Sequence, residues 1–319
     1  MGNHYIIIGG SGFVGSHLID YLVKHNQRIT VIDIIPADNA TRLKPYMTSY
    51  IRYVWKSTHD IESNDLSDAD YIIHLASQAD VPLALSSPRY TYQQNVMGIV
   101  HLLEILRKVN PEKVIYMSSE NVYGDVIPEH VPIHEDEPLR PANPYGASKA
   151  AADLTCQAYA KSYGLPITVI RSGTLFGPNA RLKQVIPIFI RQAVKGQPIT
   201  IEGDGSQTRD FNYISNLVEG VITACSSKAM GVFNMASGQE LSIFQIAVAI
   251  IKAANSKSQI VHKPWRAGEQ GLRLALDIRK AQSIFGYNPK ISFEDGLRPT
   301  IRWIRQIEGI EQEGPIIDS

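Results

Sequence analysis

The sequence predicts an α/β protein built on a doubly wound parallel sheet, with a smaller lobe formed by the C-terminal part of the chain. Three observations support this fold class. Short runs rich in β-branched residues alternate with helical patterns through the first half of the chain. A glycine-rich turn follows the first of these runs, and the regular alternation ends after about Gly177.

Six short segments of the first half have the composition of strands in a parallel sheet. Each is almost entirely apolar, which is expected of strands that helices cover on both faces. The predicted strands are residues 5–9, 28–33, 51–55, 71–75, 113–118 and 167–171.

Three longer segments between these strands have helical patterns, at residues 13–25, roughly 89–109 and 145–163. Strands that alternate with helices in this way indicate a parallel sheet with helices on both faces.

The C-terminal part has a different texture, because prolines and a glycine turn break it into short pieces. Segments 214–225 and 232–235 look able to return to the main sheet. We therefore expect residues 1–176, with returning segments near 210–236, to form the larger domain. Residues 177–319 would mainly form a substrate-binding lobe over the carboxyl ends of the strands, where open α/β sheets bind ligands.

Composition excludes several classes of function. Lys and Arg together number 31, as do Asp and Glu, and a partner such as a nucleic acid or an anionic membrane would normally require a basic excess. No apolar run reaches the length of a membrane span, and no signal peptide is recognisable before the first strand. Cys156 and Cys225 fit no metal site and are typical of buried thiols in a reducing compartment, so we expect a cytoplasmic protein.

The turn after the first predicted strand has the spacing of a dinucleotide-binding motif. Gly9, Gly12 and Gly15 would respectively permit the tight turn, let a pyrophosphate approach the backbone, and let the helix pack closely on the strand. The amides of Phe13 and Val14 open the helix and would bind the pyrophosphate. The flanking strand and helix, more than the glycines alone, make this motif specific.

Asp33 ends the second predicted strand and suits the ribose of the same cofactor. The motif expects an acidic residue about 20 positions after the first glycine, and a carboxylate there repels a 2′-phosphate. The sequence therefore predicts NAD rather than NADP. The alternative is that Asp33 only caps a turn.

Other residues at the same edge of the sheet are weaker candidates for the cofactor site. Asn95 lies inside a predicted helix, where a polar side chain is usually solvated. The candidates are Asp60, Ile61, Leu75, Ala76, Ser77 and Asn95.

A tyrosine and a lysine one helical turn apart form the candidate catalytic pair. Tyr145 and Lys149 follow Pro144, a residue favoured at helix starts, and the i, i+4 spacing puts them on one face. A phenol has a pKa of about 10, and a nearby ammonium favours the phenolate and lowers that pKa. Such pairs are usually surface pairs, but after a dinucleotide motif they become a candidate general base and its tuner. Ser119, at the end of the fifth strand, would share the proton.

With these residues in place, the chain resembles an extended short-chain dehydrogenase/reductase of the NAD-dependent epimerase/dehydratase family, over nearly its whole length. The resemblance implies a Rossmann fold, NAD as cofactor, a nucleotide-diphosphate sugar (a UDP-sugar above all) as substrate, and a homodimer formed through the helices at 89–109 and 145–163. It depends on the glycine motif, His74-Leu75-Ala76, Ser118-Ser119 with Val122-Tyr123-Gly124, Pro144-Tyr145 with Lys149, the run from Gly203 to Phe211, and Arg266 with Gly268-Glu269.

The resemblance also implies roles in substrate binding. Arg209 and Arg266 would hold the diphosphate, a task that suits the planar guanidinium. Glu269 would lie near the nucleotide ribose. Thr174 stands where many 4-epimerases have asparagine, which keeps a substrate of the UDP-glucuronate type open.

Three reactions of the family begin alike, with the C4-hydroxyl proton taken by Tyr145 as hydride moves to NAD⁺. Dehydratases typically place a glutamate, the C5 base, where this chain has Asn121, and an amide cannot serve as a base. Glu120 comes one residue early, so we expect its side chain to point elsewhere, or to be an exposed turn residue, unless the loop is rearranged. If it does reach the site, Glu120 is a further catalytic candidate.

The sequence therefore favours a UDP-sugar 4-epimerase. The alternatives within the family are a 4,6-dehydratase and a uronate decarboxylase. A non-catalytic NAD-binding scaffold is a third alternative, which the intact pair of Tyr145 and Lys149 disfavours.

Overall fold

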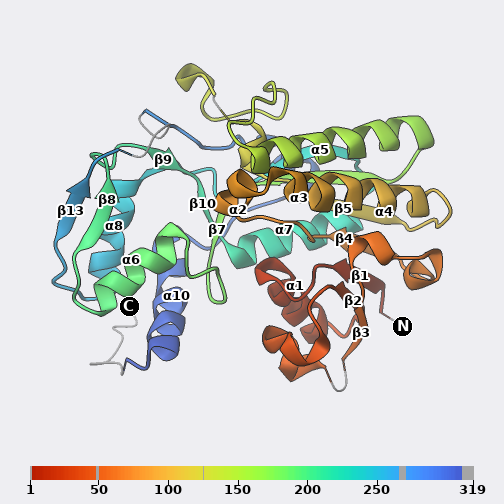
Figure 1. The fold of residues 1–319 in the computed structure, drawn as a ribbon, viewed down its shortest axis with the longest axis horizontal. Coiled ribbons are helices and arrows are strands. Elements are labelled where there is room, and N and C mark those ends of the chain that lie inside the picture. The colour runs from red at the N-terminus through yellow and green to blue at the C-terminus, as the bar shows by residue number, and fades with distance from the viewer. Residues whose placement is uncertain (1, 48–49, 125, 266–270, 311–319) are drawn as a thin grey trace.

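The computed structural model describes residues 2–47, 50–124, 126–265 and 271–310. The larger part is built around a parallel sheet, and a smaller lobe lies beside it (Figure 1). None of the helices in these ranges has both the length and the hydropathy that a membrane-spanning helix needs.

Seven parallel strands form the central sheet, and their order reverses beside the first strand of the chain. The crevice at such a reversal, outside the carboxyl ends of the strands, is where doubly wound sheets bind their ligands. From one edge to the other the strands are β11 (Gly231–Met235), β6 (Ile167–Ser172), β5 (Lys113–Met117), β4 (Tyr71–His74), β1 (His4–Ile8), β2 (Arg28–Asp33) and β3 (Ile51–Trp55).

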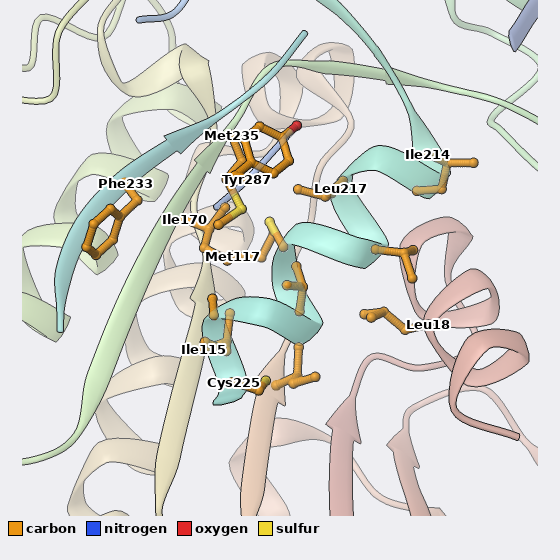
Figure 2. Packing of buried hydrophobic residues seen from close by; sticks show 14 of the residues in the cluster. Leu18, Ile115, Met117, Ile170, Ile214, Leu217, Cys225, Phe233, Met235 and Tyr287 are labelled. Carbon is orange, nitrogen blue, oxygen red and sulfur yellow. The ribbon is translucent and has the colours of Figure 1, made fainter. Parts of the chain in front are cut away.

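Helices cover both faces of this sheet, and alternate strand residues point into two separate cores. On one face, α1 (Phe13–Lys24) and α7 (Ile214–Ser226) pack on strand residues such as Ile7 and Ile115. Figure 2 shows Leu217 of α7 in the same cluster as Met117 of β5.

The opposite face of the sheet packs against two other helices. Side chains of β1, β4 and β5 that alternate with the first set, such as Ile72 and Tyr116, meet α4 (Gly98–Leu106) and α5 (Pro144–Tyr163). The predicted strands are confirmed to within one residue at each end. The expectation of burial on both faces is wrong for β3, because β3 is an edge strand: Trp55 is 66% exposed.

The helix expected at residues 89–109 is helical without a break from Pro88 to Leu106. It consists of α3 (Pro88–Tyr92), a π-helical turn at Gln93–Met97 and α4. A short helix, α2 (Val81–Ser86), precedes it. π-Helical turns often occur at functional sites, and this one contains Asn95.

The smaller lobe has its own apolar core, between three helices and a two-stranded parallel sheet (Figure 1). Phe176, Ile201, Ile246 and Leu297 are among its buried members. The elements are α6 (Val185–Val194), β8 (Ile199–Glu202), α8 (Ile243–Ala253), β13 (Ile260–Lys263) and α10 (Phe293–Glu308).

The chain passes between the two parts more than once. α7 and β11 return to the large sheet, and α9 (Arg279–Phe285) packs on β11. Two small sheets connect the parts: β7 (Thr174–Phe176) pairs with β10 (Phe211–Tyr213), and β9 (Thr208–Arg209) pairs with β12 (Leu241–Ser242). Residues of β7 and β9 are thereby brought to the carboxyl edge of the large sheet.

Candidate active site

The glycine turn is built as its spacing predicts. Gly9 has a φ of +85°, and a Cβ there would lie 2.6 Å from the amide nitrogen of Ala76. A Cβ on Gly15 would lie 2.4 Å from the carbonyl oxygen of Gly10, so only glycine allows α1 to start so close to the turn. Among the described residues, a Cβ on Gly12 would meet only the carbonyl oxygen of Gly9, at 3.3 Å, which leaves that side of the turn open.

α1 begins at Phe13, directly after this open side of the turn. The N–H groups of Phe13 and Val14 have no acceptor within their own helix, since the first turn of any helix lacks one. The turn and these amides together form a cradle suited to an anionic group.

Asp33 is buried at the end of β2 and organises this turn. Its two carboxylate oxygens accept hydrogen bonds from the amide of Ser11, at 2.8 Å, and from the amide of Ile35, at 3.0 Å. The turn-capping alternative therefore has a structural basis. It does not conflict with binding a ribose, because each carboxylate oxygen can accept a further hydrogen bond.

The other predicted cofactor residues differ in exposure. Asp60 is exposed after β3 and accepts a hydrogen bond from the hydroxyl of Ser57, while Ile61 is buried. The amides of Leu75 and Ala76 donate to the carbonyl oxygen of Ile8, which draws the loop after β4 against the glycine turn. Ser77 follows in this loop and is half-buried.

The expectation that Asn95 is solvated is wrong. Its amide is buried, accepts a hydrogen bond from the amide of Gln78 at 2.7 Å, and donates to the carbonyl oxygen of Gln78 and to the hydroxyl of Ser148. Ser148 lies next to Lys149 in α5. Asn95 therefore connects the loop after β4 with the helix that carries the predicted catalytic pair.

Tyr145 lies in the first turn of α5, where the side chain of Asn143 caps the helix by accepting from the amide of Gly146 at 3.0 Å. Burial raises the pKa of the Tyr145 phenol, while the Ser119 side chain and the charge of Arg181 act to lower it. The sequence predicts that Lys149 lowers the pKa of Tyr145. In the structure the pKa of Tyr145 is raised, and Lys149 is not among the groups that act to lower it.

Lys149 is buried and directed toward the end of β5. Its Nζ donates to the carbonyl oxygen of Met117 at 2.5 Å and lies 4.5 Å from the centroid of the Tyr116 ring. Burial lowers the pKa of Lys149 to about 8. The ammonium is thus engaged at β5, two residues before Ser119.

The expectation that Glu120 is exposed or points elsewhere is wrong. The chain forms a short 3₁₀ turn after Ser119, at Glu120–Val122, and this turn buries the carboxyl group at 3% exposure. The hydroxyl of Thr174 donates to Oε1, and Oε2 has no partner within the described ranges. Burial is the largest effect on Glu120 and raises its pKa to about 7, although the charge of Arg209 and the bond from Thr174 oppose the rise.

Asn121 turns back toward the strand end. Its backbone and side-chain amides both donate to the hydroxyl of Ser119, at 3.2 and 3.1 Å. An amide in this position orients the serine and cannot remove a proton from carbon.

Two of the predicted substrate residues are described, and both lie near Glu120. Thr174 bonds its carboxyl group, and Arg209 in β9 acts on it through its charge. Asp210, which follows Arg209, is tied to the loop after β11, because its buried carboxyl group accepts hydrogen bonds from the amides of Ser237 and Gly238. Arg266 and Glu269 lie outside the described residues.

Sequence reasoning missed Arg181. Its charge lowers the pKa of Tyr145, and its guanidinium donates to the carbonyl oxygen of Ala79 at 2.8 Å. The only signal was a basic residue soon after Gly177 and Pro178. Gln78 and Ser148, the partners of Asn95, were missed as well.

The arrangement has two halves along the carboxyl edge of the sheet. The glycine turn and Asp33 form an anion- and ribose-binding half. The other half gathers a phenol with a serine partner, a buried carboxyl group and an arginine. These are the groups needed to move a proton on and off a carbinol beside a dinucleotide.

Comparison with known proteins gives the family. The family model for the NAD dependent epimerase/dehydratase family matches residues 5–236. A putative UDP-glucose 4-epimerase of Methanocaldococcus jannaschii is 30% identical, over 94% of this chain and 98% of that protein. The UDP-glucuronic acid decarboxylase 1 of Danio rerio is 33% identical, over 95% of this chain and 73% of that protein.

A solved structure agrees with these relatives. The UDP-glucuronic acid 4-epimerase of Bacillus cereus, in complex with UDP-glucuronic acid and NAD, superimposes with a TM-score of 0.87 at 29% identity, over 95% of this chain and 99% of that one. The chain therefore belongs to the NAD dependent epimerase/dehydratase family and is an enzyme.

Proposed function

We propose that this chain is an NAD-dependent 4-epimerase of nucleotide-diphosphate sugars, with UDP-sugars as the preferred class. The observation that carries the proposal is the geometry after β5. Asn121 occupies the position of a dehydratase base, and its side-chain amide donates to the hydroxyl of Ser119, a side chain that acts to lower the pKa of Tyr145. The site can thus transfer the C4 proton, but has no carboxylate at the usual place for removing the C5 proton.

The residues of the first half fit NAD. The open side of the turn at Gly12 and the helix-opening amides of Phe13 and Val14 would bind the pyrophosphate, and Asp33 would bind the ribose. When bound there, NAD accepts a hydride from sugar C4 and later returns it.

The second half holds the sugar and its proton. Tyr145, as a phenolate, would take the C4-hydroxyl proton directly or through Ser119, and would return it after the ketone has turned over. The charge of Arg181 favours the phenolate. Arg209, with Arg266 as the resemblance implies, would hold the diphosphate.

Incubation with single UDP-sugars tests the proposal. Purified protein is mixed with NAD and UDP-glucose, UDP-N-acetylglucosamine or UDP-glucuronate in deuterated water, and the products are analysed by mass spectrometry and NMR. An epimerase gives a product of unchanged mass, inverted at C4, without deuterium at C5. Loss of water or of carbon dioxide would instead identify a dehydratase or a decarboxylase.

One observation favours the dehydratase as a second candidate. Glu120 has a buried, unpartnered Oε2 among the described residues, and burial raises its pKa to about 7, near the value expected of a general acid or base at neutral pH. A dehydratase that used Glu120 would lose turnover as Glu120→Gln and would incorporate deuterium at C5. An epimerase would retain C4 inversion in that variant.

We also propose that the enzyme works as a homodimer in the cytoplasm. α5 and the π-helical turn at Gln93–Met97 pack on one another and expose large apolar side chains, including Leu154 at 54% and Met97 at 55%. Free, buried cysteines suit a reducing compartment.

A further inference from the structure

Behind the candidate active site, three side chains with polar groups are stacked between the sheet and α5. His74 and Tyr116 are register partners on β4 and β5, and their rings stack with centroids 5.8 Å apart. The ammonium of Lys149 lies 4.5 Å from the centroid of the Tyr116 ring. All three residues are buried.

The polar atoms of the His74 and Tyr116 rings take no part in hydrogen bonding among the described residues. Both ring nitrogens of His74 and the hydroxyl of Tyr116 lack hydrogen-bond partners in the described part of the chain. Burial and the charge of Lys149 lower the pKa of His74 to about 3, so the imidazole is neutral at working pH and does not repel the ammonium. What remains for Tyr116 to offer Lys149 is the electron-rich face of its ring.

Lys149 needs such a partner, because little else offsets the burial of its charge. Its hydrogen bond goes to a neutral acceptor, the carbonyl oxygen of Met117. The charge of Asp153 acts against the lowering of the Lys149 pKa. The Asp153 carboxylate, however, is paired with the guanidinium of Arg171 at 2.9 Å and accepts from Ser118 at 2.7 Å.

We propose that Tyr116 is a positioning residue whose ring, through a cation–π contact, holds Lys149 in its charged form at the carboxyl end of β5. This proposal concerns the ammonium of Lys149, which the proposed function pairs with Tyr145. It rests on the proposed function only for its effect on catalysis. A desolvated cation–π contact is strong enough to change a lysine pKa by about one unit or more. Loss of the ring should therefore leave about half of the Lys149 side chains neutral near pH 7.

The test measures the titration of Lys149 directly. Protein labelled with ¹³C at the lysine ε-carbons is titrated by NMR, and the Lys149 signal is assigned by its absence in Lys149→Met. In Tyr116→Met, which removes the ring at similar volume, we expect the pKa of Lys149 to fall by about one unit below its value of about 8. Tyr116→Phe is the matched control, because it keeps the ring and removes a hydroxyl that has no partner among the residues that the structure describes.

Equal titration of Lys149 in Tyr116→Met, Tyr116→Phe and the wild type would overturn the proposal. If Tyr116→Met does not fold, a series of fluorinated phenylalanines at position 116 replaces it, since fluorine withdraws electron density from the ring face with little change in shape. The pKa of Lys149 should then fall stepwise with each added fluorine. A constant pKa across the series is the contrary result.

The catalytic consequence is read from the pH dependence of kcat/KM. The alkaline limb, where Lys149 loses its proton, should move to lower pH in Tyr116→Met, together with the NMR pKa. A merely structural role would lower kcat/KM at every pH and leave the limb in place. If the chain does not epimerise any UDP-sugar but the titration follows the ring, the function fails and this proposal stands. If the chain does epimerise a UDP-sugar but the pKa of Lys149 does not depend on the ring at position 116, only this proposal fails.

Discussion

The phenol of Tyr145 has a serine partner and a nearby arginine, and we predict that Tyr145→Phe nearly abolishes turnover. Loss of a positioned general base typically costs about 10²–10⁴-fold in rate. kcat for the UDP-sugar substrate is the measurement, with NAD binding by calorimetry expected to persist. Tyr159→Phe is the matched control on the same helix, because its hydroxyl bonds Glu104 far from the site. A Tyr145→Phe variant with full turnover would support a scaffold instead of an enzyme acting through this phenol.

Glu120 should make stability fall as pH rises. Burial raises its folded-state pKa to about 7 from an ordinary 4.5, so the unfolded chain releases this proton at lower pH than the native state does. The contribution is fully present below about pH 4.5 and is lost as pH rises through 7, a change on the order of 3 kcal/mol. Urea unfolding of wild type and Glu120→Gln at several pH values should show wild type losing stability relative to the variant as pH rises, because glutamine does not titrate. A difference that does not vary with pH would mean that Glu120 titrates normally.

Residue identities in the candidate site were predictable where a motif fixes them. Tyr145 and Lys149 follow from their spacing in a chain with a dinucleotide motif, and Ser119 follows from its position at the end of the fifth strand. The surroundings of Glu120 and Asn95 were not predictable. Their burial depends on a 3₁₀ turn and a π-helical turn, and neither turn leaves a recognisable pattern in one sequence.

The glycine turn of the first βα unit gives a prediction at the scale of the element. Gly9→Ala should destabilise the fold and abolish NAD binding, because the added Cβ would lie 2.6 Å from the Ala76 backbone and φ is +85°. Gly196→Ala separates the two effects, since Gly196 has a φ of +65° but nothing within 4 Å of its Cβ position. The control should lose about 1 kcal/mol, the cost of a left-handed alanine, and keep NAD binding. Equal losses of unfolding free energy in the two variants would argue against the close contact with Ala76.

The strands of the large sheet were the most predictable elements, because parallel strands covered on both faces appear as unbroken apolar runs. β3 departs from this, since it is the edge strand of the sheet that the described residues form, and Trp55 lies exposed there. The small sheets β7–β10 and β9–β12 could not be predicted, because two or three residues are too short to show a period. Yet these sheets bring Thr174 and Arg209 to Glu120.

At the scale of the whole molecule, the two parts depend on one another. β11 completes the large sheet only after the chain has passed through α6 and β8 of the smaller lobe, and α9 returns later to pack on β11. The change in sequence texture after Gly177 marks where the smaller lobe begins. The returns of segments 214–225 and 232–235 to the large sheet were expected from the sequence and are seen as α7 and β11, whereas the return of α9 was not expected.

The helices over one face of the sheet expose apolar side chains, and this predicts a dimer. Charged substitutions among these side chains should dissociate the dimer. Single exposed apolar residues are common on any surface, but here α2, α3, α5 and the π-helical turn expose a concentration of them: Leu83, Leu85, Tyr90, Tyr92, Met97, Leu154 and Tyr163. A two-fold dimer would bury such a surface against its own copy. Light scattering should therefore give the mass of two chains for the wild type, and of one chain for a Met97→Glu, Leu154→Glu double variant.

Val248→Glu is the matched control for this dimer, because Val248 is 45% exposed on α8 of the smaller lobe. This variant should keep the mass of two chains. If the wild type already has the mass of one chain, the helical face does not mediate a homodimer. If Val248→Glu dissociates the protein while the double variant does not, the interface lies on the smaller lobe. α5 carries Tyr145 and Lys149, on which catalysis is proposed to depend. Dissociation of the dimer at the helical face should therefore also lower the free energy of unfolding of α5.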